Sequence, residues 1–173
     1  MIIVLVGVLL SCSNKIEDIE KYDDSEEFPT QIAKEIEVMY STKGAVVFQL
    51  KAPLLKQYMT EKEYNEMPEG VEVKIFDSLM NVTTKLTANY AIDSTYADKM
   101  EAMYDVVVIN EKGEMLNTEH LVWDKTTGQI TSDVFVKITT ADQVLMGEGL
   151  ISNQDFSEYR ILKPRGTINI DND

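Results

Sequence analysis

The sequence predicts an all-β protein, an antiparallel β-sandwich or open, twisted β-jelly roll built from stacked hairpins. Short segments rich in β-branched and aromatic residues alternate with turn-forming residues, and a helical period is almost absent. A skeleton of a leucine, a small residue two positions later and an aliphatic residue three further on occurs four times, with the leucines 36, 30 and 29 residues apart. The copies are Leu50/Ala52/Leu55, Leu86/Ala88/Ala91, Leu116/Thr118/Leu121 and Leu145/Gly147/Leu150. A nearly constant spacing in this range indicates a repeated supersecondary unit, here a hairpin.

Length, charge and residue counts limit the classes of protein that the chain can be. With 173 residues it has enough chain for one domain with a hydrophobic core. Thirty acidic against sixteen basic residues give a formal net charge of −14, which repels phosphate backbones, so we expect no nucleic-acid partner. The single cysteine, Cys12, and the single histidine, His120, exclude an intrachain disulfide and leave Cys/His metal sites and Cys-His catalysis without enough members. We therefore expect no metal, no cofactor and no enzyme activity.

The first 31 residues are expected to lie outside the β-domain. Residues 1–11 contain an apolar run of about ten residues, too short to span a bilayer and typical of a secretory signal peptide. Leu9-Leu10-Ser11-Cys12 resembles the bacterial lipobox, so Cys12 is the expected lipidation site, although no Lys or Arg precedes the apolar run; a buried core cysteine is the alternative. Residues 12–31 then form a lipid anchor and an acidic tether, and the β-domain spans residues 32–173.

The rest of the chain is interpreted as hairpins in order. The first has strands at residues 32–40 and 45–52 and ends at Pro53. A capping-box pattern beginning at Thr60 predicts a short helical connection between residues 57 and 68. Apolar and turn-forming patterns predict the remaining strands at residues 71–77, 82–91, 101–109, 114–123, 133–139 and 144–151, with one or two closing strands in 159–170.

Strand geometry limits what the skeleton can mean. Its first two members fall on one face of a strand, but the third falls on the opposite face unless a bulge or strong twist intervenes. Small residues at the second position predict the close approach of another backbone or of a ligand. Two inner faces of a sandwich would enclose an elongated apolar interior.

Residues 32–170 resemble the LptC family, periplasmic components of the lipopolysaccharide export machine, and particularly its lipoprotein-like versions from Bacteroidetes. The segments that carry the resemblance are Gly44, Leu50-Lys51-Ala52-Pro53-Leu54, Leu86 to Ala91, Leu116 to Asp124, Thr139 and Gly147 to Phe156. The resemblance implies a twisted open β-jelly roll that accepts lipopolysaccharide from the inner-membrane ABC transporter and passes it to an LptA-like bridge protein. Its acyl chains would lie in a hydrophobic groove, and its strand edges would pair with partner jelly rolls.

The resemblance also implies a location, with one departure. We expect a periplasmic protein anchored to the inner membrane through its lipid, with the outer membrane as the alternative. LptC proteins commonly carry an N-terminal transmembrane helix, which the short apolar run does not match. We therefore do not expect this chain to share the role of that helix.

Strand parity selects the candidates for the lipid-binding groove. The inward positions are Leu86, Ala88, Val106, Val108, Leu116, Thr118, Val136, Ile138, Leu145 and Gly147. An ordinary packed core at the same positions is the alternative. A second possible function is a scaffold that docks only through its strand edges. A third is a carbohydrate-active β-sandwich. The sequence offers no carboxylate pair facing an aromatic cleft, which argues against the third.

Three further features receive structural interpretations. His120 is expected at a surface or strand edge rather than in catalysis or metal binding, and Trp123 as a packing anchor rather than a sugar platform. The basic cluster Lys163-Pro164-Arg165 is expected to be a solvated strand end, with contact to lipid phosphates or to an acidic partner edge as the alternative.

Overall fold

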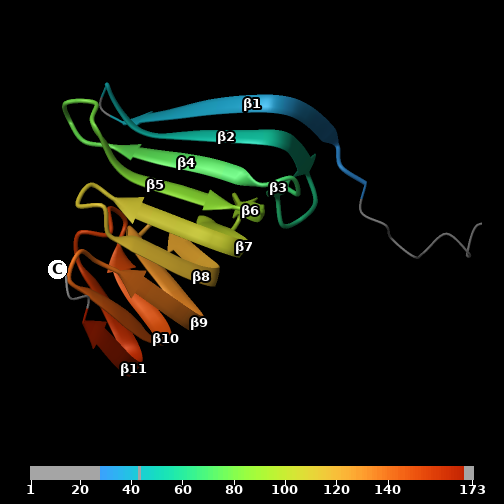
Figure 1. Ribbon diagram of the computed structural model, residues 1–173. Helices are drawn as coiled ribbons and strands as arrows, with labels where there is room; N and C mark the ends of the chain where they lie inside the picture. The colour runs from blue at the N-terminus through green and yellow to red at the C-terminus, as the bar shows by residue number, and fades with distance from the viewer. Residues whose placement is uncertain (1–27, 43, 170–173) are drawn as a thin grey trace, which may run out of the picture.

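The computed structural model describes residues 28–42 and 44–169. They form eleven strands and no helix, hydrogen-bonded into one antiparallel sheet (Figure 1). The strands are β1 (Gln31–Thr42), β2 (Ala45–Tyr58), β3 (Tyr64–Met67), β4 (Val71–Phe76), β5 (Val82–Ala88), β6 (Tyr90–Ser94), β7 (Lys99–Asn110), β8 (Met115–Asp124), β9 (Gln129–Thr139), β10 (Gln143–Asn153) and β11 (Tyr159–Asn169). The predicted all-β, jelly-roll-like class is confirmed. The predicted signal peptide, Cys12 and the tether as far as residue 27 lie outside the described residues.

Two local predictions are wrong. Pro53 does not end the first hairpin, because β2 continues through it to Tyr58. Proline has no N–H for the ladder, and here the pairing passes from Ala52 to Leu54 without needing one. No helix forms between residues 57 and 68: the Thr60 hydroxyl accepts a hydrogen bond from the Lys62 N–H at 3.3 Å in a turn, and β3 follows.

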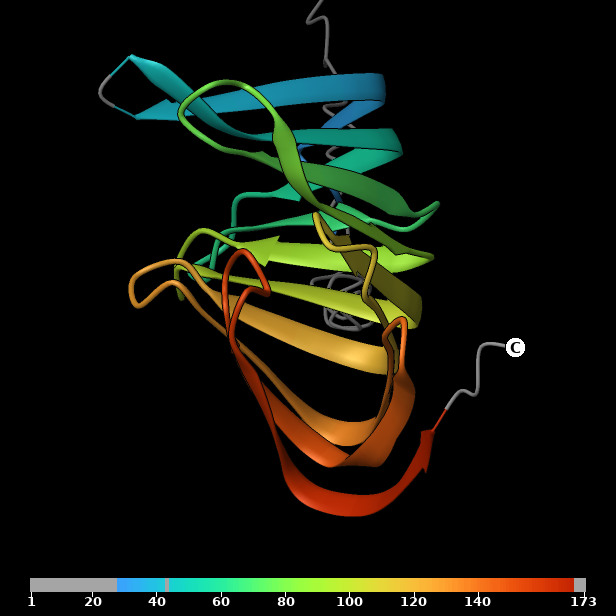
Figure 2. The same cartoon turned by 60° about the vertical axis from the view of Figure 1, so that its left-hand side comes forward.

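The sheet folds on itself, because two of its strands each pair with two different partners along one edge. Strand β7 pairs with β6 through residues 99–103 and with β5 through residues 107–110. Strand β2 pairs in the same way with β4 and then with β3. The sheet therefore divides into two layers, which we call the β4/β5 layer and the β3/β6 layer. The other long strands run through both, and Figure 2 shows them curving round the interior, most clearly β11 in red.

We call the line along which the strands pass between the layers the corner. Five residues with positive φ mark it: Glu35 (50°), Gly70 (96°), Tyr104 (64°), Asp105 (52°) and Gly149 (77°). The ladders also shift register there, between Met103 and Val106 and between Glu148 and Leu150, for example. Bulges of this kind bend a strand and insert one unpaired residue.

The register shifts at the corner explain the repeated skeleton. In the third copy, Leu116 and Thr118 face the interior from the β4/β5 layer, where Thr118 pairs with Val136. After the corner, Leu121 pairs with Ala102 in the β3/β6 layer and is also buried. At the corner, two residues of β8 separate the inward Thr118 from the inward Leu121 where regular alternation would leave one, so all three members of the copy enter one core. The third members of two other copies are likewise buried, Ala91 and Leu150, and Leu55 is partly buried.

The core lies between the two layers. Buried residues from the β4/β5 layer, such as Val73 and Val108, belong to one cluster with Leu121 and Ile130 of the β3/β6 layer. Burial of each such aliphatic side chain stabilises the fold by about 1.5–3 kcal/mol. The interior surface of the folded sheet is therefore apolar from strand to strand.

Candidate functional site

The ten predicted groove residues lie together on the inner face of the β4/β5 layer. Five belong to one continuous line of cross-strand neighbours, which we call the leucine row. From β2 to β10 the row runs Leu50, Val73, Leu86, Val108, Leu116, Ile138 and Leu145. Residues directly opposite on paired strands share a face, so the row is an unbroken apolar strip across seven strands.

The other five lie beside the corner, and the structure explains the residue type at two of them. A Cβ on Gly147 would lie 2.5 Å from the Lys163 carbonyl oxygen of β11, so a neighbouring backbone requires glycine there. The Thr118 hydroxyl donates a 2.8 Å hydrogen bond to the Phe135 carbonyl. It thereby satisfies an acceptor next to a register shift of the β8–β9 ladder. At both positions the close approach is that of another strand's backbone. The others, Ala88, Val106 and Val136, are buried.

Most inward residues of β7 to β10 are buried, and two hollows lie between the layers. The larger hollow has a volume of about 40 Å³, enough for roughly three waters. Its lining faces the hollow with apolar atoms from both layers: Val73, Ile75, Thr84, Leu86, Met100, Ala102, Leu121, Trp123, Ile130 and Phe156. The smaller hollow, of about 10 Å³, lies between residues that include Leu116, Leu150 and Tyr159. Burial there raises the pKa of the Tyr159 phenol, with a further contribution from Glu114.

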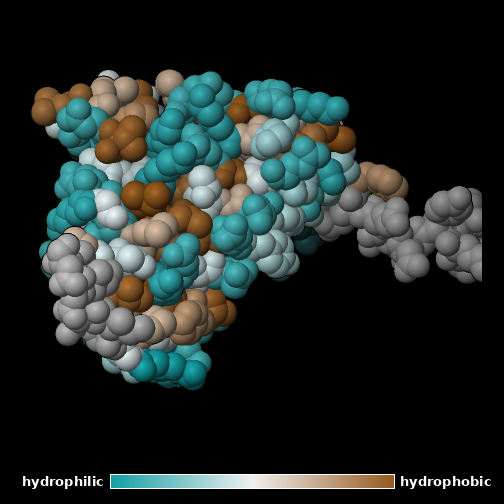
Figure 3. All heavy atoms as spheres, viewed as in Figure 1, coloured by the Kyte–Doolittle hydropathy of each residue, from teal (hydrophilic) through white to brown (hydrophobic). Residues whose placement is uncertain are grey.

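The apolar interior reaches solvent at the β1 end. The leucine row continues onto β1 through Val38, which pairs with the buried Leu50 but is 47 % exposed. Tyr40, two residues along, stacks on Phe48 at a centroid distance of 5.1 Å and is also exposed. In Figure 3, apolar residues are among those exposed at the upper left of the view, where Figure 1 places the β1–β2 and β4–β5 turns.

A second opening lies at the corner, where β4 and β5 part from β3 and β6. It encloses about 550 Å³, with buried Ala52, Val71 and Ala88 among its lining residues. Charged side chains also line it: Glu35, Glu37, Lys51, Glu69 and Glu72. The Glu72 carboxylate accepts from Lys85 Nζ at 2.7 Å, and this bond holds the pKa of Glu72 below its usual range. The acidic lining disfavours an anionic group at this opening.

Sequence reasoning missed the loop that joins β10 to β11. This loop, residues 154–158, reaches from the β3/β6 layer to the β4/β5 layer. Thr84 Oγ1 of β5 donates to the Asp155 carbonyl at 2.9 Å, and Asn110 Nδ2 of β7 donates to the Phe156 carbonyl at 3.3 Å. Phe156 lies between the layers with 5 % of its surface exposed and borders both hollows. The available signal was a single aromatic residue, Phe156, in a polar loop. The side chains that bond to the loop belong to residues 46 and 71 positions earlier in the sequence.

Trp123 is a packing residue of the interior. Its ring meets Phe48 edge to face, at 5.6 Å between centroids, and so joins the two layers. It also borders the larger hollow. Its indole Nε1 is buried and has no hydrogen-bond partner among the described residues. A buried donor without a partner is uncommon.

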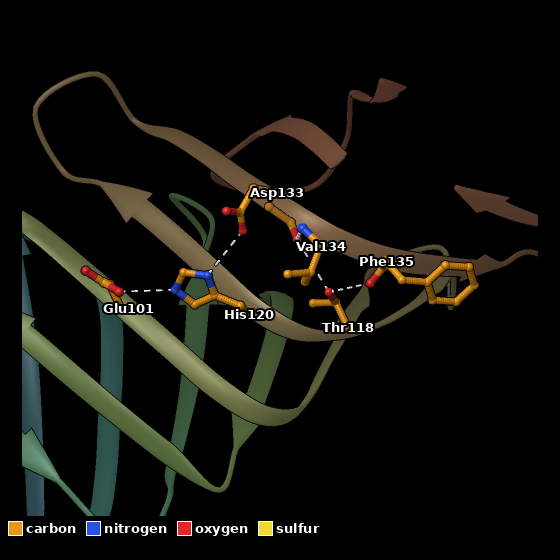
Figure 4. A network of polar contacts seen from close by, with 7 residues as sticks. Glu101, Thr118, His120, Asp133, Val134 and Phe135 are labelled. Carbon is orange, nitrogen blue, oxygen red and sulfur yellow. Dashed lines mark hydrogen bonds and ion pairs between the residues drawn. The ribbon is translucent and has the colours of Figure 1, made fainter. Parts of the chain in front are cut away.

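His120 lies on the outer face of the β3/β6 layer and lines neither hollow. Figure 4 shows its ring between Glu101 and Asp133. Its Nε2 is 3.1 Å from Glu101 Oε2 on β7, and its Nδ1 is 3.5 Å from Asp133 Oδ1 on β9. These contacts join three neighbouring strands on a partly exposed surface. Within the described residues, no group of three or more His, Cys, Asp or Glu side chains could hold a metal ion.

A cleft lined by tyrosines on the outer face of the β3/β6 layer bears on the carbohydrate alternative. Its carboxylate, Glu66, accepts from Tyr90 Oη at 2.9 Å and Tyr58 Oη at 3.1 Å, and pairs with Lys56 at 3.9 Å. Burial, followed by this contact with Glu66, raises the pKa of Tyr90. A carboxylate with three partners and no second carboxylate in the lining of the cleft does not form a glycosidase pair.

The two ends of the sheet are unpaired among the described strands. Strand β1 pairs with β2 alone and β11 with β10 alone. The predicted basic cluster lies exposed on β11, where the Arg165 guanidinium pairs with Glu148 of β10. Both edges can in principle add a strand from another chain.

No family model and no curated protein matches the sequence. Of the residues that the structure describes, none belongs to a helix long and apolar enough to cross a membrane.

Proposed function

We propose that the protein is a periplasmic module of lipopolysaccharide transport that holds lipopolysaccharide acyl chains between its two β-layers. The proposal takes its substrate and its place in transport from the resemblance to LptC. The observation that supports it most is the leucine row, an apolar strip that crosses seven strands and continues to an exposed end at Val38. A row of this length offers an acyl chain contact on successive strands without a polar interruption.

The mechanism is burial of acyl chains against the inner strand faces. Each methylene that leaves water contributes about 0.8 kcal/mol, while phosphorylated head groups stay hydrated outside an acidic protein surface. The closely packed section from β7 to β10 has to widen for a chain to pass, so chains enter first at the β1 end. Energy for movement comes from the ABC transporter, because the sequence contains no Gly-rich phosphate-binding loop.

The strand edges and the N-terminus complete the proposed role. The free edges of β1 and β11 would pair with neighbouring jelly rolls of the transporter complex and of the LptA-like bridge. Cys12 would carry the lipid that anchors the chain to the inner membrane. The module therefore guides lipopolysaccharide and does not drive its movement.

The test compares two neighbouring residues of β1 that face opposite ways. Val38 pairs with Leu50 on the inner face, whereas Met39 pairs with Gln49 on the outer face, and both are about half exposed. In cells whose only copy is the variant, we expect Val38→Asp to stop lipopolysaccharide from reaching the outer membrane and Met39→Asp to support transport. A charge on the apolar path opposes the passage of acyl chains. Full transport by Val38→Asp would contradict the proposal.

A strand-edge scaffold is the second candidate, and the close packing of the middle section favours it. Val136 and Leu150 have no exposed surface, and the larger hollow holds only about 40 Å³. A scaffold would use β1 solely as a docking edge. Val38→Asp and Met39→Asp would then affect transport equally, because both lie on that edge.

A further inference from the structure

A cleft on the outer face of the β3/β6 layer is separate from the apolar interior. We call it the tyrosine cleft, because Tyr58, Tyr64 and Tyr90 line it together with Glu66. Its volume of about 370 Å³ falls within the range of about 300–1,000 Å³ that is common for small-molecule sites. The outward face of a solvated antiparallel sheet is ordinarily polar, so three tyrosines gathered in one hollow there require an explanation.

A stacked pair of tyrosines forms one wall of the cleft. Tyr58 on β2 and Tyr64 on β3 are cross-strand partners, and their rings stack at 4.6 Å between centroids and 11° between planes. Tyr58 is buried, so the sheet holds the pair in place. On the β6 side, the cross-strand neighbour of Tyr64 is Ser94, which also lines the cleft. Because serine is small, room remains beside the Tyr64 ring for the flat face of a ligand.

Tyr90 forms the opposite wall. Its ring meets Tyr104 of β7 edge to face, at 6.0 Å between centroids. Tyr90 and Ser94 lie at the two ends of β6, about 13 Å apart at the usual rise of an extended strand. Ile92 lines the cleft between them and pairs with Glu66 of β3. The cleft is therefore elongated along β6, with an aromatic ring at each end.

The Glu66 carboxylate connects the two walls. It accepts a hydrogen bond from Tyr58 Oη at 3.1 Å and one from Tyr90 Oη at 2.9 Å. An ionised carboxylate has about four acceptor positions, so the two tyrosines leave acceptor capacity unused. The Glu66 side chain keeps 19 % of its surface exposed. Lys62, from the turn between β2 and β3, adds an ammonium group to the lining.

This mixture of groups limits the chemistry of a ligand. The lining carries both signs of charge, so an anion meets Glu66 and a cation meets Lys62, with Lys56 3.9 Å from the Glu66 carboxylate. A hydrocarbon chain would desolvate these charged groups without pairing them. A sugar ring matches the lining better. The C–H groups on one of its faces pack against the negative face of an aromatic ring, and its hydroxyls donate to a carboxylate and accept from an ammonium.

We propose that the tyrosine cleft is a non-catalytic binding site for neutral sugar residues of a glycan, with Tyr64 as the stacking platform and Glu66 and Lys62 as the hydrogen-bonding groups. The inference goes beyond the proposed function, in which the protein contacts acyl chains through its inner face. Two sources supply this chemistry: the saccharide part of lipopolysaccharide, and a separate envelope polysaccharide.

The test is calorimetric titration of the full chain with four oligosaccharides. One is the core oligosaccharide released from lipopolysaccharide by mild acid, and the others are maltohexaose, cellohexaose and mannohexaose. We expect at least one of them to bind with a Kd between about 10 μM and 1 mM. Tightest binding of the core oligosaccharide assigns the site to lipopolysaccharide, and tightest binding of a hexaose assigns it to a separate polysaccharide. Failure of all four to bind at about 1 mM would overturn the proposal.

Variants of the cleft test the assigned roles with whichever oligosaccharide binds. We expect Tyr64→Ala to weaken binding at least about 10-fold, because an aromatic anchor at a binding site carries much of the affinity. Tyr64→Phe keeps the ring and should change affinity less than about 2-fold. Lys62→Met removes one donor at an exposed residue and should weaken binding about 2- to 10-fold. Unchanged affinity for both Tyr64→Ala and Lys62→Met would place the sugar elsewhere and contradict the site.

Two controls separate the cleft from general effects. Tyr96→Ala removes a tyrosine that is 69 % exposed in the neighbouring β6–β7 turn and does not line the cleft, so sugar affinity should stay the same. Val38→Asp, on the inner face of β1, should also leave sugar binding unchanged while it stops transport. Loss of sugar binding in either control would contradict a site confined to the tyrosine cleft. Normal transport by Val38→Asp, with sugar binding that depends on Tyr64, would keep the site and reject the acyl path.

Discussion

The same leucine row is closed in the middle of the molecule and open at its β1 end. Along β7 to β10, row residues such as Val108 and Leu116 are buried beneath the opposite layer. On β1, Val38 belongs to the same row but is half exposed, and β1 is an edge strand that pairs with β2 alone among the described strands. One sequence pattern thus gives two surfaces, and coverage by the opposite layer decides whether an apolar residue is core or accessible groove.

The difference in coverage predicts a large difference in stability effects. Leu150→Ala, in the closed section, removes a fully buried side chain and should lower the free energy of unfolding by about 2–5 kcal/mol. Val38→Ala, at the open end, should lower it by less than about 0.5 kcal/mol. Urea unfolding of the two variants measures both losses. Similar losses would mean that the β1 end is as tightly packed as the middle.

The close approach of strands in the closed section can be tested with two glycines. Gly147→Ala should lower the free energy of unfolding by about 1–3 kcal/mol, because its Cβ would collide with the β11 backbone. Gly113→Ala, in a turn with φ of 76° and no neighbour within 4 Å of a Cβ, should cost at most about 1 kcal/mol, through its backbone conformation alone. If both variants unfold at the same urea concentration, steric closure at Gly147 is not the reason for its size.

A smaller effect is expected at the β4–β5 turn, on the β1 side of the sheet. Asp77 accepts from the Asn81 side chain at 2.9 Å and from the backbone N–H groups of Asn81 and Leu79, and these bonds hold its pKa below the ordinary value of 3.8. Because the folded-state pKa is depressed, its stabilisation is present above about pH 4 and is lost as the pH falls through that lower value.

The pH profile tests this contribution. Thermal midpoints of the wild type and Asp77→Asn should differ above about pH 4 and converge in stronger acid. Asp142→Asn is the control, since the Asp142 carboxylate makes no hydrogen bond within the described residues and only the Asp142 backbone N–H is bonded, to Thr140 Oγ1. A difference for Asp77→Asn that persists at the lowest pH would contradict the assigned sign.

Local patterns predicted most strands and the inward face of the row, because alternation and turn residues act within a few positions. They could not predict that Leu121 faces inward, since its parity depends on a bulge at the corner. They failed at Thr60, where a short side chain stabilises a turn as readily as a helix start. The contacts of the β10–β11 loop were out of reach for a different reason: Thr84 and Asp155 meet only because the sheet folds in two.

The most direct measurement of the central claim is photo-crosslinking at Val38 and Met39 in living cells. The two positions share a strand, an edge and a similar exposure, and they differ in the face on which they lie. The account predicts lipopolysaccharide adducts from a crosslinker at Val38 and none from one at Met39. Adducts at both positions, or at neither while the protein supports transport, would contradict an acyl path along the leucine row.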